Sequence, residues 1–275
     1  MPEPIVPVAA ASSTTAPGAG PPGAPVLVLG NSLGTSAAVW GQQVAMFGRH
    51  FHVVGYELPG HGGSPAAAGP YTIGGLGAGV LALLDSLGVD RFAYCGISLG
   101  GMIGMWLASH APDRVTALGL VCTSAYLPPA DGWMARAGQV RAAGMASVSG
   151  AVIGRWFTPA FAVRTPQVIA EFQAELERTD PAGYAGCCEA IAGMDLRPDL
   201  PGVAAATLVL AGADDPATPP EHGAAIASLV PGARLEVLTD AAHLATVQAP
   251  ERVTSVLLEH LIAASRSGDT GPRPG

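Results

Sequence analysis

The sequence predicts a doubly wound α/β fold, in which helices cover both faces of a mostly parallel sheet and a helical cap is inserted between two strands. From Pro25 onward, short β-branched or leucine-rich runs alternate with longer helical patterns, as in parallel sheets covered on both faces. This alternation stops between Val121 and Thr207 and then resumes. Glycine and proline pairs mark the joins, as in Pro59-Gly60 and Pro231-Gly232.

Six short apolar runs are expected to form the strands of the sheet. In chain order they are Val26–Leu29, His52–Tyr56, Phe92–Cys95, Ala117–Val121, Thr207–Ala211 and Arg234–Val237. The segments between and after them carry helical patterns, which predict helices at Ala37–Phe47, Leu76–Leu87, Met102–Ala111, His222–Leu229 and Glu251–Ala264.

The region without strands predicts a group of helices, at Trp133–Gly144, Ser147–Trp156, Thr165–Glu177 and Tyr184–Gly193. Helices inserted between parallel strands have to lie at one edge of the sheet, and ligands of open α/β sheets bind beyond the carboxyl ends of the strands. We therefore expect residues 126–199 to form a cap on a core made of residues 25–125 and 200–264. Residues 1–24 are expected to be a flexible segment with weak edge strands, and residues 265–275 a disordered tail.

Composition limits the classes of function. The 275 residues include 13 basic and 21 acidic side chains, a formal charge of −8 without runs of like charge, which argues against nucleic-acid or anionic membrane partners. Lysine is absent, so lysine Schiff-base and P-loop chemistry are excluded. The four cysteines lack metal or redox spacing and are expected to be reduced packing residues. Without a signal-peptide pattern or a long apolar run, we expect a soluble, cytoplasmic protein.

The segment Gly96-Ile97-Ser98-Leu99-Gly100 matches the pattern G-x-S-x-G. It follows the predicted strand Phe92–Cys95 and opens a helical pattern at Met102, which is the strand–turn–helix context of a nucleophile elbow. Ser98 would then lie at the apex of a strained turn, as a catalytic nucleophile. The alternative is a glycine-rich turn that holds an ordinary serine.

A serine nucleophile needs a histidine base and an acid, and this kind of fold places them in the order Ser, acid, His. His243 is the one histidine in a loop beyond the last predicted strand, and we expect it to be the base. Asp214 and Asp215 follow the strand Thr207–Ala211. Asp215 fits a G-x-x-D spacing from Gly212 and is the expected acid, with Asp214 as the alternative. The other histidines are interpreted as surface, capping or turn residues: His50, His52, His61, His110, His222 and His260.

An oxyanion hole needs two backbone N–H groups aimed at the developing negative charge. One is expected from Leu99, which follows the nucleophile, and the other from Leu33 in the loop after the first core strand. That loop could otherwise be a tight turn that caps the helix beginning near Ser36.

These motifs resemble those of the α/β-hydrolase superfamily and, within it, the 3-oxoadipate enol-lactonases. The resemblance covers roughly residues 25 to 262 and rests on a few sequence strings. They are Leu27–Thr35, Gly69–Ile73, Cys95–Met102, Arg155–Phe161, Asp180–Tyr184 with Cys187-Cys188, and Ala211–Pro220. Two features depart from the family pattern: Pro59 replaces an arginine in Glu57–Gly62, and the N-terminal strands are reduced to a Pro/Ala/Ser segment.

The resemblance implies an enzyme of aromatic catabolism, in the β-ketoadipate pathway, that opens a small anionic enol-lactone to 3-oxoadipate through an acyl-serine, without metal or organic cofactor. A carboxylate in an apolar pocket needs an arginine or backbone donors. The cap candidates are Arg136 and Arg155, with Trp133 and Trp156 as pocket walls; the alternative is that these arginines face solvent. Rival functions on the same triad are carboxylesterase, C–C bond hydrolase and cofactor-free perhydrolase. A non-catalytic binding protein of this fold is a further alternative.

Overall fold

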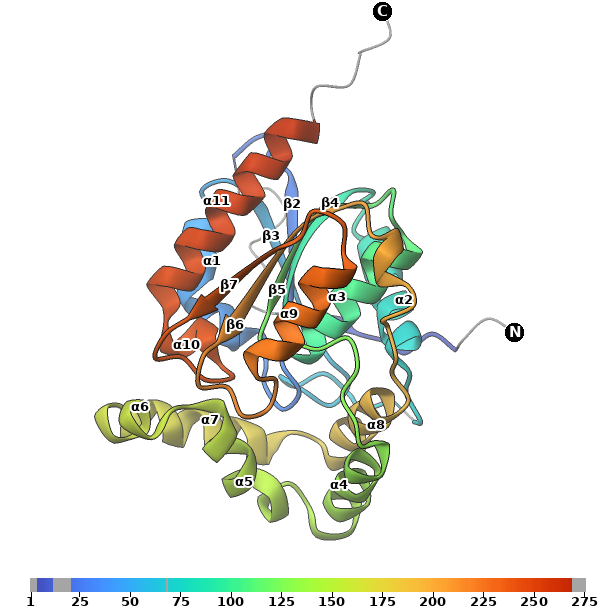
Figure 1. The fold of residues 1–275 in the computed structure, drawn as a ribbon. Coiled ribbons are helices and arrows are strands. Elements are labelled where there is room, and N and C mark those ends of the chain that lie inside the picture. Colours follow the sequence, from blue (N-terminus) through green and yellow to red (C-terminus); the bar gives the residue numbers. More distant parts are fainter. Residues whose placement is uncertain (1–3, 12–20, 68, 269–275) are drawn as a thin grey trace, which may run out of the picture.

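The computed structural model describes residues 4–11, 21–67 and 69–268 (Figure 1). Its strands form one sheet in the order β1-β3-β2-β4-β5-β6-β7. All neighbours pair in parallel except β1 (Ala9–Ala10), which is antiparallel to β3. The other strands are β2 (Val26–Gly30), β3 (His52–Glu57), β4 (Phe92–Ile97), β5 (Val115–Val121), β6 (Ala206–Gly212) and β7 (Arg234–Leu238). The predicted fold class is therefore confirmed, and each predicted strand is present within two residues of its expected bounds.

Helices cover both faces of this sheet (Figure 1). Helices α1 (Gly41–Phe47) and α11 (Pro250–Gly268) lie on one face, and α2 (Ile73–Ser86), α3 (Leu99–His110) and α9 (Pro220–Leu229) lie on the other. The predicted helix 37–47 is divided into the 3-10 turn Ala37–Trp40 and α1. Two further short elements are the 3-10 turn Leu200–Gly202 and α10 (Ala245–Gln248).

The central strand β4 shows why the sequence pattern predicts this arrangement. Every residue from Phe92 to Ile97 is buried, because helices pack against both faces of the strand. A strand of this kind is a continuous apolar run rather than an alternation of apolar and polar residues, and it delivers the residue that follows it to the carboxyl edge of the sheet.

Five helices are inserted between β5 and β6 and lie together at one end of the sheet (Figure 1). They are α4 (Ala130–Ala143), α5 (Ala146–Trp156), α6 (Pro159–Arg164), α7 (Pro166–Arg178) and α8 (Pro181–Ala192). The sequence analysis missed α6. Its signal was local, because Thr158 caps the helix by accepting the N–H of Phe161 at 3.3 Å, and Pro159 occupies the first helical position.

The C-terminal end of the chain differs from expectation where it is described, whereas the short edge strand β1 lies in the N-terminal segment in which weak edge strands were expected. Helix α11 continues to Gly268, so residues 265–268 are helical rather than part of a disordered tail. No proline or glycine occurs in residues 265–267, and the Ser265 hydroxyl donates to the carbonyl of Leu261 at 2.6 Å. Residues 12–20 and 269–275, also expected to be flexible, lie outside the described residues.

Two general features of the described chain bear on function. None of its helices is long and apolar enough to cross a bilayer. Among residues 4–11, 21–67 and 69–268, no three His, Cys, Asp or Glu side chains gather in a group that could hold a metal ion.

Candidate active site

Ser98 occupies the turn between β4 and α3 with a strained backbone. Its φ is 55° and its ψ is −118°, a conformation that non-glycine residues rarely adopt. The strand and the helix approach so closely there that a Cβ on Gly96 would lie 2.3 Å from the carbonyl oxygen of Gly100. A Cβ on Gly100 would lie 2.4 Å from that of Gly30. The turn therefore has the geometry of a nucleophile elbow, and its small residues are required by packing.

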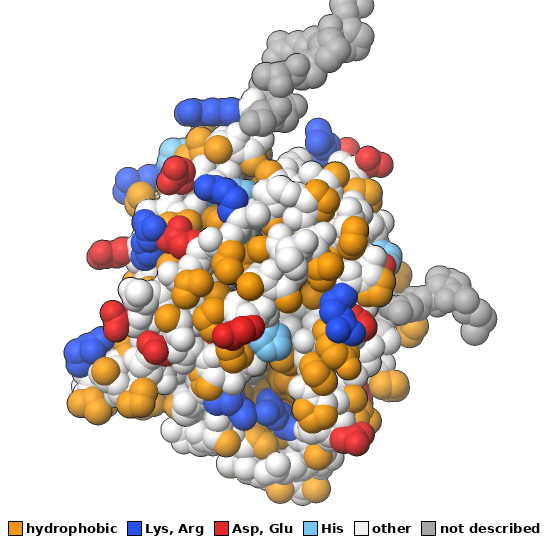
Figure 2. Space-filling model, viewed as in Figure 1, with side chains coloured by type: hydrophobic (Ala, Val, Ile, Leu, Met, Phe, Trp, Pro, Cys, Tyr) orange, Lys and Arg blue, Asp and Glu red, His pale blue; other side chains and the backbone are white. Residues whose placement is uncertain are grey.

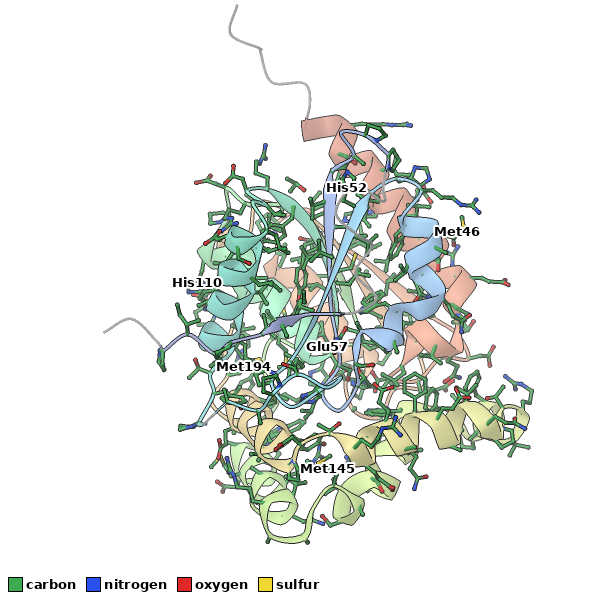
Figure 3. The ribbon with its side chains drawn as sticks, turned by 180° about the vertical axis from the view of Figure 1, so that it is seen from behind. Met46, His52, Glu57, His110, Met145 and Met194 are labelled. Atoms are coloured by element: carbon green, nitrogen blue, oxygen red, sulfur yellow. The ribbon has the colours of Figure 1, made fainter. Side chains whose placement is uncertain are left out.

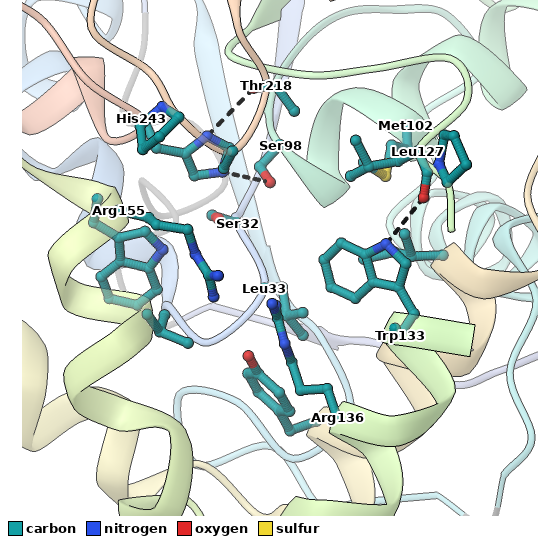
Figure 4. A pocket seen from close by; sticks show the side chains of 18 of the residues that line it. Ser32, Leu33, Ser98, Met102, Leu127, Trp133, Arg136, Arg155, Thr218 and His243 are labelled. Atoms are coloured by element: carbon teal, nitrogen blue, oxygen red, sulfur yellow. Dashed lines mark hydrogen bonds between the residues drawn. The ribbon is translucent and has the colours of Figure 1, made fainter. Parts of the chain in front are cut away.

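Three side chains from three strand ends meet at this elbow. Nε2 of His243 lies 2.9 Å from Oγ of Ser98 (Figure 4), and Nδ1 of His243 lies 2.8 Å from Oδ2 of Asp215. All three residues are buried. They follow β4, β6 and β7, so the parallel strands deliver them to one edge of the sheet.

Asp215 is held by a dense set of donors. Its Oδ1 accepts the N–H groups of Ala217 at 2.8 Å and Thr218 at 3.1 Å, and its Oδ2 accepts the Thr218 hydroxyl at 2.7 Å. Burial alone would raise the pKa of Asp215, but the charge of His243 and the hydrogen bonds from His243 and Thr218 outweigh it and lower this pKa. Asp214 is exposed and lies in a separate cleft, so the structure brings Asp215 rather than Asp214 to His243.

The two residues expected to donate to an oxyanion lie on either side of the elbow. Leu99 is the first residue of α3, where backbone N–H groups have no acceptor within the helix. Leu33 lies in the loop after β2 and lines the same cavity as Ser98. The N–H of Gly100 donates to the carbonyl of Asn31 at 2.9 Å, which ties that loop to the elbow.

Ser98 and His243 open into a cavity of about 270 Å³ between the sheet and the inserted helices. Its lining includes all four pocket residues that the sequence analysis named, together with Tyr184, which it missed. The four predicted residues are Trp133, Arg136, Arg155 and Trp156. In Figure 4 the guanidinium groups of Arg136 and Arg155 point into the cavity. Figure 2 shows basic side chains in the hollow between the inserted helices and the rest of the molecule.

The charge of this cavity is unbalanced. No aspartate or glutamate of the described chain lines it, and within the same residues neither Arg136 nor Arg155 forms an ion pair with a carboxylate. The Arg136 guanidinium instead lies 4.5 Å from the ring centre of Trp133. Burial and the charge of Arg136 lower the pKa of Arg155. Two cations that form no ion pair within the described residues therefore face one largely apolar space beside Ser98.

Known proteins share this architecture and sequence. A family model of the α/β-hydrolase fold matches residues 25–145. The chain is 40% identical to 3-oxoadipate enol-lactonase 2 of Acinetobacter baylyi over 227 residues, which are 82% of this chain and 85% of that protein. The chain belongs to the 3-oxoadipate enol-lactonase family.

Further members of the family agree with this assignment. The enol-lactonase 1 of Acinetobacter baylyi is 34% identical over 237 residues, 86% of this chain and 88% of that protein. The crystal structure of the enol-lactonase from Burkholderia xenovorans LB400 matches with a TM-score of 0.85 at 40% identity, covering 87% of this chain and 92% of that one. The predicted resemblance to the enol-lactonase family is confirmed.

Two other histidines, His260 and His61, are buried and make contacts that the sequence analysis did not predict. His260 lies inside α11 rather than at a helix end, and its Nε2 contacts the carbonyl oxygens of Leu118 at 3.2 Å and Ala206 at 3.1 Å. The interpretation of His260 as a surface or capping residue was therefore wrong. His61 does lie in a turn, but it is buried against Tyr184, and burial lowers its pKa to about 4.

The four cysteines of this enol-lactonase family member are buried, as expected of reduced packing residues. Cys95, Cys122, Cys187 and Cys188 are all buried, and none forms a disulfide. Burial raises the pKa of each thiol, so none is poised as a thiolate nucleophile.

Proposed function

We propose that this enol-lactonase family member hydrolyses 3-oxoadipate enol-lactone, a small anionic lactone, to 3-oxoadipate. The observation that carries the proposal is that a hydrogen-bonded Ser98–His243–Asp215 set adjoins a cavity lined by two arginines, neither of which forms an ion pair within the part of the chain that the structure describes. The first feature suits acyl transfer, and the second suits a substrate with a carboxylate. The names of the Acinetobacter and Burkholderia relatives support the same substrate.

In the first half of the reaction, Ser98 Oγ attacks the lactone carbonyl while His243 Nε2 accepts the hydroxyl proton. Asp215 accepts the Nδ1–H of His243 and stabilises the imidazolium that forms. The N–H groups of Leu33 and Leu99 donate to the developing oxyanion. Collapse of the tetrahedral intermediate breaks the ring C–O bond, and His243 returns the proton to the enolate oxygen that leaves.

The second half of the reaction releases the product. The enol produced by ring opening tautomerises to the ketone while the acyl group remains on Ser98. His243 then removes a proton from water, which attacks the acyl carbonyl, and the returning proton restores the Ser98 hydroxyl. The newly formed acid leaves as a carboxylate, so the product carries one more negative charge than the substrate.

Arg136 and Arg155 are proposed to hold the carboxymethyl group of the substrate. A carboxylate taken from water into a largely apolar cavity needs charged or hydrogen-bonding partners, and guanidinium groups supply both. Trp133 and Trp156 form apolar walls on either side. By the same argument, residues 126–199 are proposed to act as a cap that selects the substrate, while the core supplies the catalytic groups.

The direct test follows the ultraviolet absorbance of the enol-lactone with purified protein, beside p-nitrophenyl acetate as a neutral ester. The proposal expects rapid loss of the lactone, slow cleavage of the ester, and neither reaction above background with Ser98→Ala. Efficient ester cleavage without lactone turnover would instead indicate a carboxylesterase.

A further inference from the structure

Glu57 is a buried carboxylate that lies outside the catalytic set. It is the last residue of β3 and is only 7% exposed. Figure 3 shows it at the end of the sheet that faces the inserted helices. Its Oε1 accepts the backbone N–H of Ala37 at 3.1 Å, and its Oε2 accepts the Asn31 side-chain amide at 3.2 Å. Glu57 therefore contacts both ends of the loop that contains Leu33.

Asn31 links this carboxylate to the nucleophile elbow. Its side chain is fully buried, and its Nδ2 also donates to the carbonyl of Tyr56 at 2.7 Å. Its backbone carbonyl accepts the N–H of Gly100, two residues beyond Ser98, at 2.9 Å. The contacts from Glu57 through Asn31 to Gly100 thus join the loop that contains Leu33 to the first turn of α3, which begins at Leu99.

A second carboxylate reaches the same loop from the inserted helices. Glu175 of α7 accepts the backbone N–H of Ser36, next to the Ala37 amide held by Glu57. Burial raises the pKa of Glu57 to about 7; the hydrogen bond from Ala37 opposes this shift, the charge of Glu175 adds to it, and the hydrogen bond from Asn31 opposes it. Burial of the Glu57 carboxylate is therefore unfavourable, and two N–H donors, those of Ala37 and Asn31, offset part of its cost.

We propose that Glu57 is a positioning residue for the oxyanion hole, and that it acts by fixing the loop 30–37 through Asn31 and the Ala37 amide. The proposal rests on the proposed function, because it assigns Glu57 a part in the acyl-transfer step. An oxyanion hole accelerates a reaction only when its donors are already in place, and small displacements reduce the rate steeply. Glu57 does not touch the substrate and acts only through the position of Leu33.

The substitution Glu57→Gln tests this with little change in shape. It replaces one of the two oxygens that share the hydrogen bonds from Ala37 and Asn31 with an NH2 group, which donates and cannot accept. A matched control is Glu189→Gln in α8. Glu189 is another nearly buried carboxylate, with a side chain 13% exposed that pairs with Arg141, and it does not line the cavity.

The experiment compares two ligands and the reaction itself in the full-length protein. Phenylboronic acid forms a tetrahedral adduct on a serine nucleophile and places an oxygen in the oxyanion hole. Adipate is expected to bind beside Arg136 and Arg155 and to form no such adduct. For Glu57→Gln we expect kcat and boronate affinity to fall about tenfold, less than the hundredfold or more of a deleted oxyanion donor. KM and adipate affinity should stay unchanged, and Glu189→Gln should resemble the wild type throughout.

Two results would overturn the inference. One is unchanged kcat and boronate affinity in Glu57→Gln; the other is an equal fall in adipate and boronate affinity, which would indicate general disturbance of the pocket. If Glu57→Gln does not fold, Asn31→Ala is expected to show the same split between the two ligands, and the same two results in that variant would overturn the inference. A wild-type protein that neither hydrolyses the lactone nor binds the boronate would refute the proposed function as well.

Discussion

A Cβ atom on Gly183, at the start of α8, would lie only 2.3 Å from the carbonyl oxygen of Pro59 in the turn after β3. The backbones of the inserted helices and of the sheet domain therefore touch at this point. The N–H of Asp180 also donates to the carbonyl of Gly60 at 2.9 Å. Tyr184, the next residue in α8, lines the active-site cavity, so this contact fixes one of its walls.

Gly183→Ala should lower the free energy of unfolding by about 1–3 kcal/mol, because the methyl group would meet backbone atoms that cannot rotate away. The matched control is Gly150→Ala in α5, where an added Cβ has no neighbour within 4 Å. That helical change should be neutral or stabilise by about 0.5–1 kcal/mol. Chemical denaturation measures both; equal stability of the two variants would show that the Gly183 contact can relax.

Ser98→Ala and His243→Ala should each reduce kcat by about four to six orders of magnitude, because the members of such a triad act as a unit. Ser98→Ala leaves no buried charge without its partner, so its circular dichroism and thermal unfolding should remain close to those of the wild type. His243→Ala removes the ion-pair partner of Asp215, which keeps its hydrogen bonds from Ala217 and Thr218, so this variant should fold with a lower Tm. Activity within tenfold of the wild type in either variant would exclude the proposed mechanism.

Asp215→Asn should reduce kcat far more than Asp214→Asn. An amide at position 215 can turn an N–H toward His243 and favour the wrong tautomer, a change worth about 10⁴ in kcat in comparable triads. Asp214 is exposed and directs no atom at the imidazole, so its variant should stay within a few-fold of the wild type. The reverse ranking in steady-state kinetics would transfer the role of acid to Asp214.

Glu57 should also make stability depend on pH. Burial raises its pKa from an ordinary value of 4.5 to about 7, so between these values the folded protein keeps a proton that the unfolded chain has released. The free energy of unfolding therefore falls as pH rises through this window and is lowest above it. The Tm of the wild type minus that of Glu57→Gln should decrease from about pH 5 to pH 7.5. A constant difference would contradict the shifted pKa.

The parts of the site that sequence predicts well depend on local patterns. Ser98 could be found because an apolar strand, a glycine-flanked serine and a helical pattern follow one another within a few residues. His243 and Asp215 could be found because parallel strands deliver the residues after them to a common edge. The pocket arginines were named because the substrate that the resemblance implies carries a carboxylate, and Arg136 and Arg155 are two of the six arginines in residues 126–199.

Other residues depend on long-range packing that no local pattern reveals. Thr218 is the exception, because it donates to Asp215 three residues earlier, and the local string Asp-x-x-Thr after a strand could have signalled this. His260 was misread because the two strand residues that contact it, Leu118 in the middle of β5 and Ala206 at the start of β6, are 142 and 54 residues away in sequence. Glu57 stood out only as part of a segment that departs from the family, and its link to Asn31 required the parallel pairing of β2 with β3.

The recognition of a negative charge beside the nucleophile is the central claim, and one ratio tests it most directly. The measurement is kcat/KM for 3-oxoadipate enol-lactone divided by kcat/KM for its methyl ester, under identical conditions. Loss of a charged hydrogen bond to Arg136 or Arg155 costs roughly 1.5–3 kcal/mol, so the ratio should be about ten to one hundred. Replacement of the responsible arginine by alanine, with Arg136 tested before Arg155, should bring it close to one. A wild-type protein that prefers the neutral methyl ester would contradict the account and favour a carboxylesterase with an apolar pocket.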